Sequence, residues 1–150
     1  MAFIIIVGFV IPWITGIYLY KQAPKIFYTT APITALIAVV LNQAGIHMGL
    51  WEVNPMPRII LLDSLFLDLG VFTLAGAWFT YMLVYKSVNT LLVYILFIGG
   101  MSSLEGLAVL VGTVDYDDTW SFFYTILMYV GGFLFIGWIS HLLKKLKVFP

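Results

Sequence analysis

Three acidic residues of this 150-residue chain lie inside long hydrophobic stretches: Asp63, Asp68 and Glu105. A charged carboxylate at the centre of a bilayer costs at least about 2.5 kcal/mol, so an acid at such a position is expected to have a specific role. It can bind a proton or a cation, or it can accept hydrogen bonds that join helices. The other four acids lie in polar connecting segments, where solvation accounts for them: Glu52, Asp115, Asp117 and Asp118.

Asp68 and Glu105 are predicted to lie at a similar depth in the membrane. A helix rises about 1.5 Å per residue, so Asp68 lies about 14 Å below Ile59, near the start of its hydrophobic stretch. Glu105 lies at about the same depth below Val114, because the next helix runs in the opposite direction. The two carboxylates are therefore expected to lie in one layer.

Polar residues of an earlier hydrophobic stretch are predicted to join this layer. Asn42 has a comparable depth, Gln43 is adjacent to it, and His47 lies one turn nearer the surface. We therefore predict that these residues form a site for a proton, a cation or a polar ligand. Asp63, which lies near the membrane interface, is a further candidate residue of this site. Because Asp63 points about 140° away from Asp68, the two cannot serve one compact site.

The alternative is that these residues only join helices. The two deep acids would then be protonated or hydrogen-bonded to Asn42, Gln43, His47 or Ser102, at about 0.6–2 kcal/mol for each bond. A protein of this kind would be an accessory subunit without a ligand. Small residues support close helix contact and recur in two stripes: Ala35, Ala38, Asn42, Gly45 and Gly49, and Gly99, Ser103 and Gly106.

The residue types exclude several classes of site. There is no cysteine, so disulfides, thiolate metal sites and iron–sulfur clusters are excluded. His47 has no HxxxH or HxxE spacing, and His141 lies near the opposite membrane face, so we predict no metal site. No heme-binding histidine pair, phosphate loop or nucleophile elbow is present. We accordingly expect no cofactor and assign no catalytic residue.

The elements that hold these residues must be membrane helices. Hydrophobic residues make up 63% of the chain and charged residues 9%, with a mean hydropathy of +1.07. A soluble protein has about 25% charged residues, so a soluble nucleic-acid-binding or secreted protein does not fit. The chain is expected to bind membrane lipids and no nucleic acid.

The fold predicted is all-α, a single polytopic domain over residues 1–150 with five transmembrane helices. Their expected bounds are 3–20, 26–50, 59–85, 90–114 and 120–143. Short connections make consecutive helices antiparallel, so six lysines share one side and only Arg58 lies on the other. The positive-inside rule then places the N-terminus outside and the C-terminus in the cytoplasm. Because 150 residues form a narrow bundle, a conducting path is expected to need a homo-oligomer or a larger membrane subunit.

The segment Gly49-Leu50-Trp51-Glu52-Val53-Asn54-Pro55, with the later Ser103-Leu104-Glu105, resembles a family of small multi-pass membrane proteins from spore-forming bacteria. This resemblance implies the multi-pass topology and a bacterial plasma membrane, and no activity. The same segment is more faintly similar to the small lycopene cyclase modules, in which acids of the following helix are implicated in protonating a polyene. That resemblance implies a third alternative, an enzyme acting on a lipid or isoprenoid. Here Asp63 and Asp68 are five residues apart, whereas the cyclase pattern has adjacent acids.

Overall fold

The computed structural model describes residues 5–54 and 64–150 and is mostly helical, at 77%. Four of its helical segments are long and apolar enough to cross a membrane: Pro24–His47, Leu65–Val84, Thr90–Leu110 and Phe122–Lys145. A further helical run precedes them, formed by a five-residue and a twelve-residue element. In chain order the elements are η1 (Ile6–Val10), α2 (Ile11–Gln22), α3 (Pro24–Phe27), α4 (Thr30–His47), β1 (Trp51–Val53), α5 (Leu65–Leu67), η3 (Asp68–Phe72), α6 (Thr73–Val84), α7 (Thr90–Leu110), β2 (Val114–Tyr116) and α8 (Phe122–Lys145).

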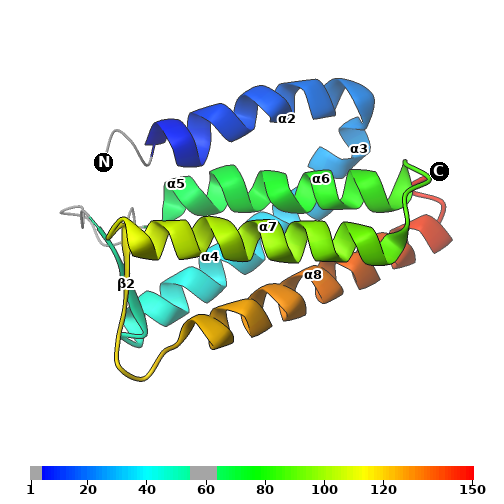
Figure 1. Cartoon of the computed structure of the whole chain (residues 1–150). Helices are drawn as coiled ribbons and strands as arrows, with labels where there is room; N and C mark the ends of the chain where they lie inside the picture. The colour runs from blue at the N-terminus through cyan, green and yellow to red at the C-terminus, as the bar shows by residue number, and fades with distance from the viewer. Residues whose placement is uncertain (1–4, 55–63) are drawn as a thin grey trace.

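The helices form an up-and-down bundle with α6 at its centre (Figure 1). α6 packs against α4, α7 and α8, and α8 also packs against α7 and α4. The run of η1 and α2 covers α6 and η3 from one side. The burial of the four segments agrees with this central position of α6. More than half of the residues in the α5–α6 segment are buried, whereas fewer than a third are buried in each of the other three segments.

Two helices end in the same way before the two short strands. Gly49 follows α4 and Gly112 follows α7, each with a positive φ, of 68° and 71°. At each end the next amide bonds back across the last turn, from Leu50 to the Gly45 carbonyl and from Thr113 to the Ala108 carbonyl. Glycine adopts this left-handed conformation without a Cβ penalty, which ends both helices and redirects the chain.

The strands that follow pair with each other across the end of the bundle. β1 and β2 are antiparallel, with Trp51 opposite Tyr116 and Glu52 opposite Asp115. Gly45 accommodates the Trp51 indole, because a Cβ at this glycine would overlap the ring. The strand pair thus connects the segment that follows α4 with the segment that follows α7, and the Trp51 ring packs against Gly45 of α4.

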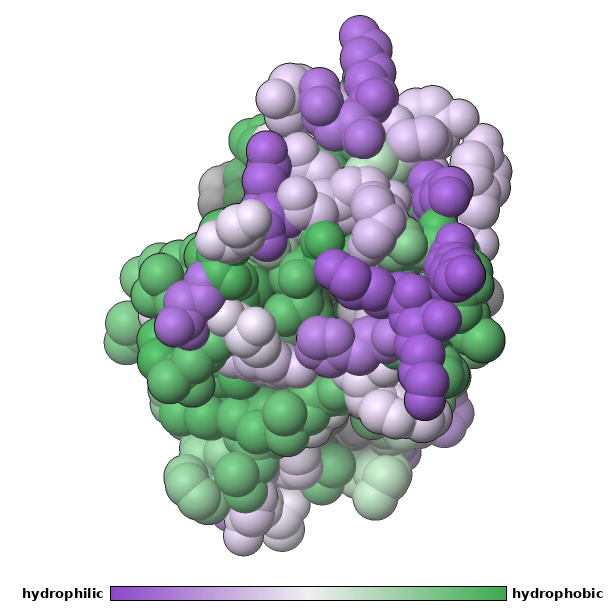
Figure 2. Space-filling model, turned by 90° about the vertical axis from the view of Figure 1, so that its right-hand side faces the viewer, coloured by the Kyte–Doolittle hydropathy of each residue, from purple (hydrophilic) through white to green (hydrophobic). Residues whose placement is uncertain are grey.

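Charges separate between the two ends of the bundle. Figure 2 looks onto the end that carries the C-terminus, where hydrophilic side chains gather. We call it the lysine end, and its lysines are Lys21, Lys25, Lys86, Lys144, Lys145 and Lys147. The opposite end carries β1 and β2 and is called the acidic end, and its exposed acids are Glu52, Asp115, Asp117 and Asp118.

Several expected helix bounds need correction. The helix expected over 26–50 begins at Pro24, is interrupted at Tyr28 and Thr29, and ends at His47. The helix expected over 90–114 ends at Leu110, because Gly112 turns the chain, and the last one runs from Phe122 to Lys145. The segments 51–53 and 114–116, which we expected to be loop or helix end, form strands. The start of the third helix, 59–63, lies outside the described residues.

Candidate functional site

Asp68 is completely buried near the acidic end, and uncharged side chains hold both of its carboxylate oxygens. Asn42 of α4 donates its side-chain N–H to Oδ1 at 2.5 Å. The Ser64 hydroxyl donates to Oδ2 at 2.7 Å, and Gln43 in turn donates to the Ser64 Oγ at 3.3 Å. The Asp68 network therefore joins the third helical segment to α4 through hydrogen bonds alone.

A widened helical turn positions Asp68. η3 is a π-helix over Asp68–Phe72, and its backbone carbonyl at Asp68 accepts from the Thr73 amide and from the Thr73 hydroxyl, the latter at 2.6 Å. η1 is also a π-helix, and the two touch where Gly70 meets Gly8. A Cβ at Gly70 would lie 2.7 Å from the Phe9 Cα and closer still to the Gly8 carbonyl oxygen. π-turns are rare and occur frequently at functional sites.

Glu105 of α7 accepts hydrogen bonds at both of its carboxylate oxygens from a second group of side chains. The Tyr116 hydroxyl of β2 donates to Oε1 at 2.8 Å, and the Tyr129 hydroxyl of α8 donates to Oε2. Thr125 lies 3.4 Å from Oε1 and 2.9 Å from the Tyr116 hydroxyl. The Trp120 indole donates to the Thr125 Oγ at 3.0 Å and thereby fixes it. The Glu105 network thus joins α7, β2 and α8.

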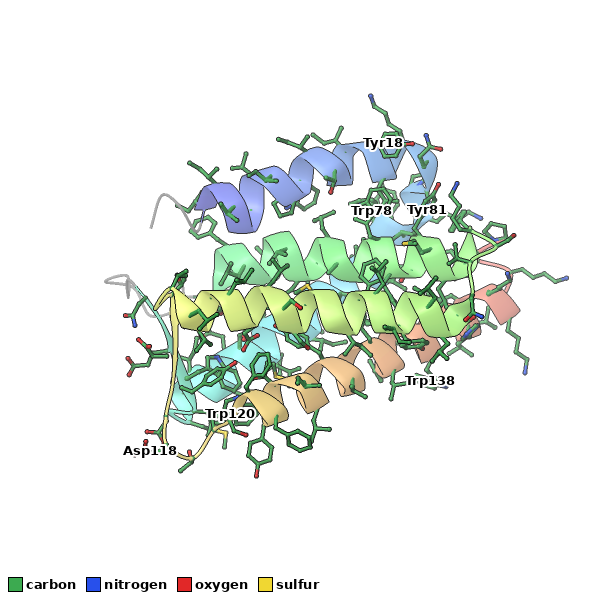
Figure 3. All side chains as sticks on the ribbon, in the orientation of Figure 1. Tyr18, Trp78, Tyr81, Asp118, Trp120 and Trp138 are labelled. Carbon is green, nitrogen blue, oxygen red and sulfur yellow. The ribbon has the colours of Figure 1, made fainter. Side chains whose placement is uncertain are left out.

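The outer edge of this network is closed by aromatic rings. The Trp51 and Trp120 rings are 4.9 Å apart at their centroids, and Trp120 lies beside the start of α8 (Figure 3). Asp118 lies at the tip of the connection that leads to it, away from the bundle. Burial raises the pKa of the Tyr116 hydroxyl well above its ordinary value of 10.0, and the Glu105 charge adds to this, although the Thr125 hydrogen bond acts in the opposite direction. Tyr116 therefore remains a hydrogen-bond donor at physiological pH.

An aromatic pair connects the elements that carry the two carboxylate networks. The Tyr129 ring stacks on Phe72, one turn beyond Asp68, with a centroid distance of 6.2 Å and an interplanar angle of 23°. Among the described residues no hydrogen bond joins Asp68 to Glu105, so the two carboxylates belong to separate hydrogen-bond networks.

A cavity of about 70 Å³ lies between α4 and α8, with Phe72, Ala75 and Met101 on its inner walls. Asn42 and Tyr129, which bind the two carboxylates, both line it. Its walls are otherwise almost entirely apolar, and half-exposed residues such as Leu41 and Gly132 lie along its sides. We call it the α4–α8 cavity.

The structure brings only some of the predicted site residues together. Asn42 and Gln43 enter the Asp68 network, whereas His47 is exposed at the end of α4 and makes none of the side-chain hydrogen bonds found in the described residues. Asp63 lies outside the described residues. Within residues 5–54 and 64–150, no group of three or more histidine, aspartate or glutamate side chains is placed to hold a metal ion.

The donors to Glu105 were not among our predicted site residues. Tyr129 is both buried and hydrogen-bonded. Thr125 and Tyr129 are four residues apart and therefore share a helix face, which was the available sequence signal. Ser102, named as a possible partner for the acids, is buried with no hydrogen-bond partner for its hydroxyl among the described residues.

Comparisons with protein-family models, with curated proteins and with solved structures find no match to this chain. The two resemblances based on residues 49–55 and 103–105 therefore remain predictions. The function proposed below rests on the geometry of the two carboxylate networks.

Proposed function

We propose that this chain is a five-span protein of a bacterial plasma membrane, with its N-terminus outside and its C-terminus in the cytoplasm. Four helices of membrane-spanning length and the segregation of lysines at one end support this topology. The chain has no cysteine, so single cysteines report sidedness without background. In intact cells an impermeant maleimide is expected to label Asp118→Cys and to reach Lys145→Cys only after permeabilisation. The reverse pattern would contradict this orientation.

Within this topology we propose that the carboxylate networks bind a proton or a polar ligand, and that the protein is a small component of a transport or channel assembly. One observation carries the proposal: two carboxylates lie in adjacent networks, and only uncharged donors contact them among the described residues. Neutral donors stabilise a carboxylate without cancelling its charge. In a low-dielectric environment an ionised carboxylate without a positive partner is unfavourable, and binding a proton is the simplest way to neutralise it.

The arrangement of the Glu105 network gives a proton a route toward the membrane interior. Tyr116 lies in the strand pair at the acidic end, and Tyr129 lies on the wall of the α4–α8 cavity. Both hydroxyls bond to the same carboxyl group, one on each oxygen. A proton taken up at the acidic end is thereby brought to Tyr129 on the cavity wall, which also carries Asn42, a hydrogen-bond partner of Asp68.

The proposal is tested by removing each carboxyl charge while keeping its shape. We expect Asp68→Asn and Glu105→Gln to abolish proton flux into proteoliposomes that contain a pH-sensitive dye. Glu52→Gln is the matched control, because Glu52 is an exposed carboxylate on β1. Circular dichroism and gel filtration establish that each variant folds.

Infrared spectroscopy supplies a second readout that does not require flux. The carbonyl stretch of a protonated carboxylic acid is expected in the wild-type protein and is expected to weaken in Asp68→Asn or Glu105→Gln but not in Glu52→Gln. Unchanged flux together with an unchanged carbonyl band in both Asp68→Asn and Glu105→Gln would refute proton binding.

An accessory subunit without a ligand is the second candidate, and one observation favours it. Gly99 and Gly100 on α7 and Gly131 on α8 face open space, since a Cβ at each would meet nothing within 4 Å. Small exposed residues let another membrane helix approach closely. If this candidate holds, gentle extraction followed by native mass spectrometry recovers a larger subunit or a homo-oligomer, and Gly99→Leu releases it. A stable monomer with no partner would count against it.

The enzyme alternative has weaker support. A catalytic acid must reach its substrate, and Glu105 is not among the described residues that line the α4–α8 cavity. Its two oxygens are occupied by tyrosine hydroxyls. The infrared and flux experiments therefore come before any search for a product.

A further inference from the structure

We propose that the α4–α8 cavity binds the hydrocarbon chain of an uncharged membrane amphiphile whose hydroxyl head donates a hydrogen bond beside Asn42 and Tyr129. This inference rests on the proposed membrane topology and names the ligand class for the polar-ligand site. It follows from the shape, the walls and the hydrogen-bonding groups of the cavity.

The walls fit a hydrocarbon chain. The cavity of about 70 Å³ has room for about five water-sized groups, but its lining offers water few partners, and apolar cavities stay dry. Half-exposed lining residues on α4 and α8, among them Leu41 and Gly132, border its opening to the surroundings of the bundle. In a bilayer those surroundings are lipid chains, so a chain can enter from the side and leave its remainder in the membrane.

Three polar side chains on the wall keep the capacity to accept a hydrogen bond. Asn42 gives a side-chain N–H to Asp68, and its side-chain oxygen accepts no hydrogen bond within the described residues. Tyr129 gives its proton to Glu105, which leaves the phenol oxygen with acceptor capacity. Thr34, also on the wall, gives its proton to the Thr30 carbonyl. A ligand head that matches them is a donor, such as a hydroxyl.

The walls also disfavour an anionic head. The Tyr129 and Thr34 hydroxyls give their protons to Glu105 and to the Thr30 carbonyl, and the lysines that could balance a negative charge lie at the other end of the bundle. An ammonium head is also disfavoured, because it would be desolvated without contacting a carboxylate, neither of which lines the cavity within the described residues. An uncharged alcohol meets both conditions.

Photolabelling in nanodiscs tests the assignment. The probe is a hexadecanol with a diazirine in its chain. It is compared with its methyl ether, in which a methyl group replaces the donating hydrogen, and with the matching hexadecylamine and hexadecanoate. Mass spectrometry locates the labelled peptides. We expect the alcohol to label α4 and α8 saturably and about fivefold more strongly than the ether, because one net hydrogen bond contributes about 1 kcal/mol.

Two adjacent glycines provide the variant and its control. Gly132 lines the cavity, and a Cβ there meets nothing within 4 Å, so Gly132→Met is expected to fill the cavity. Gly131 also faces open space and does not line the cavity, so Gly131→Met makes the same change of residue outside it. We expect Gly132→Met to reduce labelling about tenfold and Gly131→Met to leave it unchanged. Ala38→Met fills the cavity from α4 and serves if Gly132→Met does not fold.

Three results would overturn the inference. They are equal labelling of wild type and both cavity-filling variants, equal labelling by the alcohol and its ether, and stronger labelling by the amine or the carboxylate. The proposed proton function fails separately, through unchanged flux and infrared bands in the carboxyl variants. Saturable, ether-sensitive labelling with those bands unchanged would leave a lipid-binding protein without proton binding.

Discussion

Gly70→Ala is the substitution for which the structure gives the clearest energetic expectation. The new Cβ would lie 2.7 Å from the Phe9 Cα, whereas ordinary contacts begin at 3.4 Å, and it would approach the Gly8 carbonyl oxygen even more closely. Both obstacles are backbone atoms, so relief requires η1 to move away from η3. Overpacking of this kind costs about 1–3 kcal/mol, and a backbone obstacle places the cost at the upper end.

Two further glycines separate this effect from helix propensity. Replacing glycine by alanine within a helix stabilises it by up to about 1 kcal/mol when nothing obstructs the methyl group. Gly131→Ala meets nothing and is expected to show that gain. Gly137→Ala meets the hydroxyl of Tyr94, which is the far end of a side chain that can rotate away. We therefore expect stability in the order Gly131→Ala, Gly137→Ala, Gly70→Ala, with about 3 kcal/mol between the first and the last.

Reversible unfolding in mixed micelles of a mild detergent and dodecyl sulfate measures this order, with circular dichroism as the signal. The free energy of unfolding is compared among the three variants at one detergent composition. If Gly70→Ala were as stable as Gly131→Ala, the contact between Gly8 and Gly70 would not exist in the membrane protein. The packing of the first helical run against the Asp68 turn would then be refuted.

Three other changes have definite expected outcomes. Tyr129→Phe removes a donor to Glu105 and is expected to lower the free energy of unfolding by about 1 kcal/mol, whereas the exposed Tyr124→Phe is expected to change it little in the same assay. The pKa of Tyr116 is raised on folding, so its contribution to stability is complete below pH 10.0 and falls as the pH rises toward the folded pKa. In an alkaline titration that compares wild type with Tyr116→Phe, we expect Tyr116 to ionise at a higher pH than the exposed tyrosines. Titration of Tyr116 together with the exposed tyrosines would contradict its burial. Asn89 caps α7 by accepting two backbone N–H bonds, so Asn89→Ala is expected to cost about 1 kcal/mol of unfolding free energy, and no loss would show that this cap is unimportant.

The sequence alone was sufficient to predict the apolar helices and the separation of charged residues between the two ends of the bundle. Runs of about 20 apolar residues have few other stable forms in a chain with 9% charged residues, so four of the expected segments are helices of membrane-spanning length. Depth also follows from sequence, because a helix advances by a fixed rise. Asn42 and Asp68, which we placed at comparable depth, are hydrogen-bonded to each other.

Other features depended on the neighbours of each element. Gly45 and Gly49 form a GxxxG pair that we interpreted as a helix-contact stripe. In the structure Gly45 makes room for the Trp51 ring and Gly49 ends α4 in a left-handed turn. The same residue type serves for contact or for turning, and only the path of the following chain distinguishes the two uses.

The tertiary structure also decided which donors each carboxylate receives. A helix fixes the depth of Asp68 and Glu105, but their partners depend on how each helix is rotated and which helix lies beside it. Rotation is set by side-chain packing, here by the stacking of Tyr129 on Phe72 and by the contact of Gly8 with Gly70. These contacts join residues more than fifty positions apart, and hydrophobic periodicity carries no information about them. Only the tertiary structure therefore shows that the two carboxylates belong to separate hydrogen-bond networks.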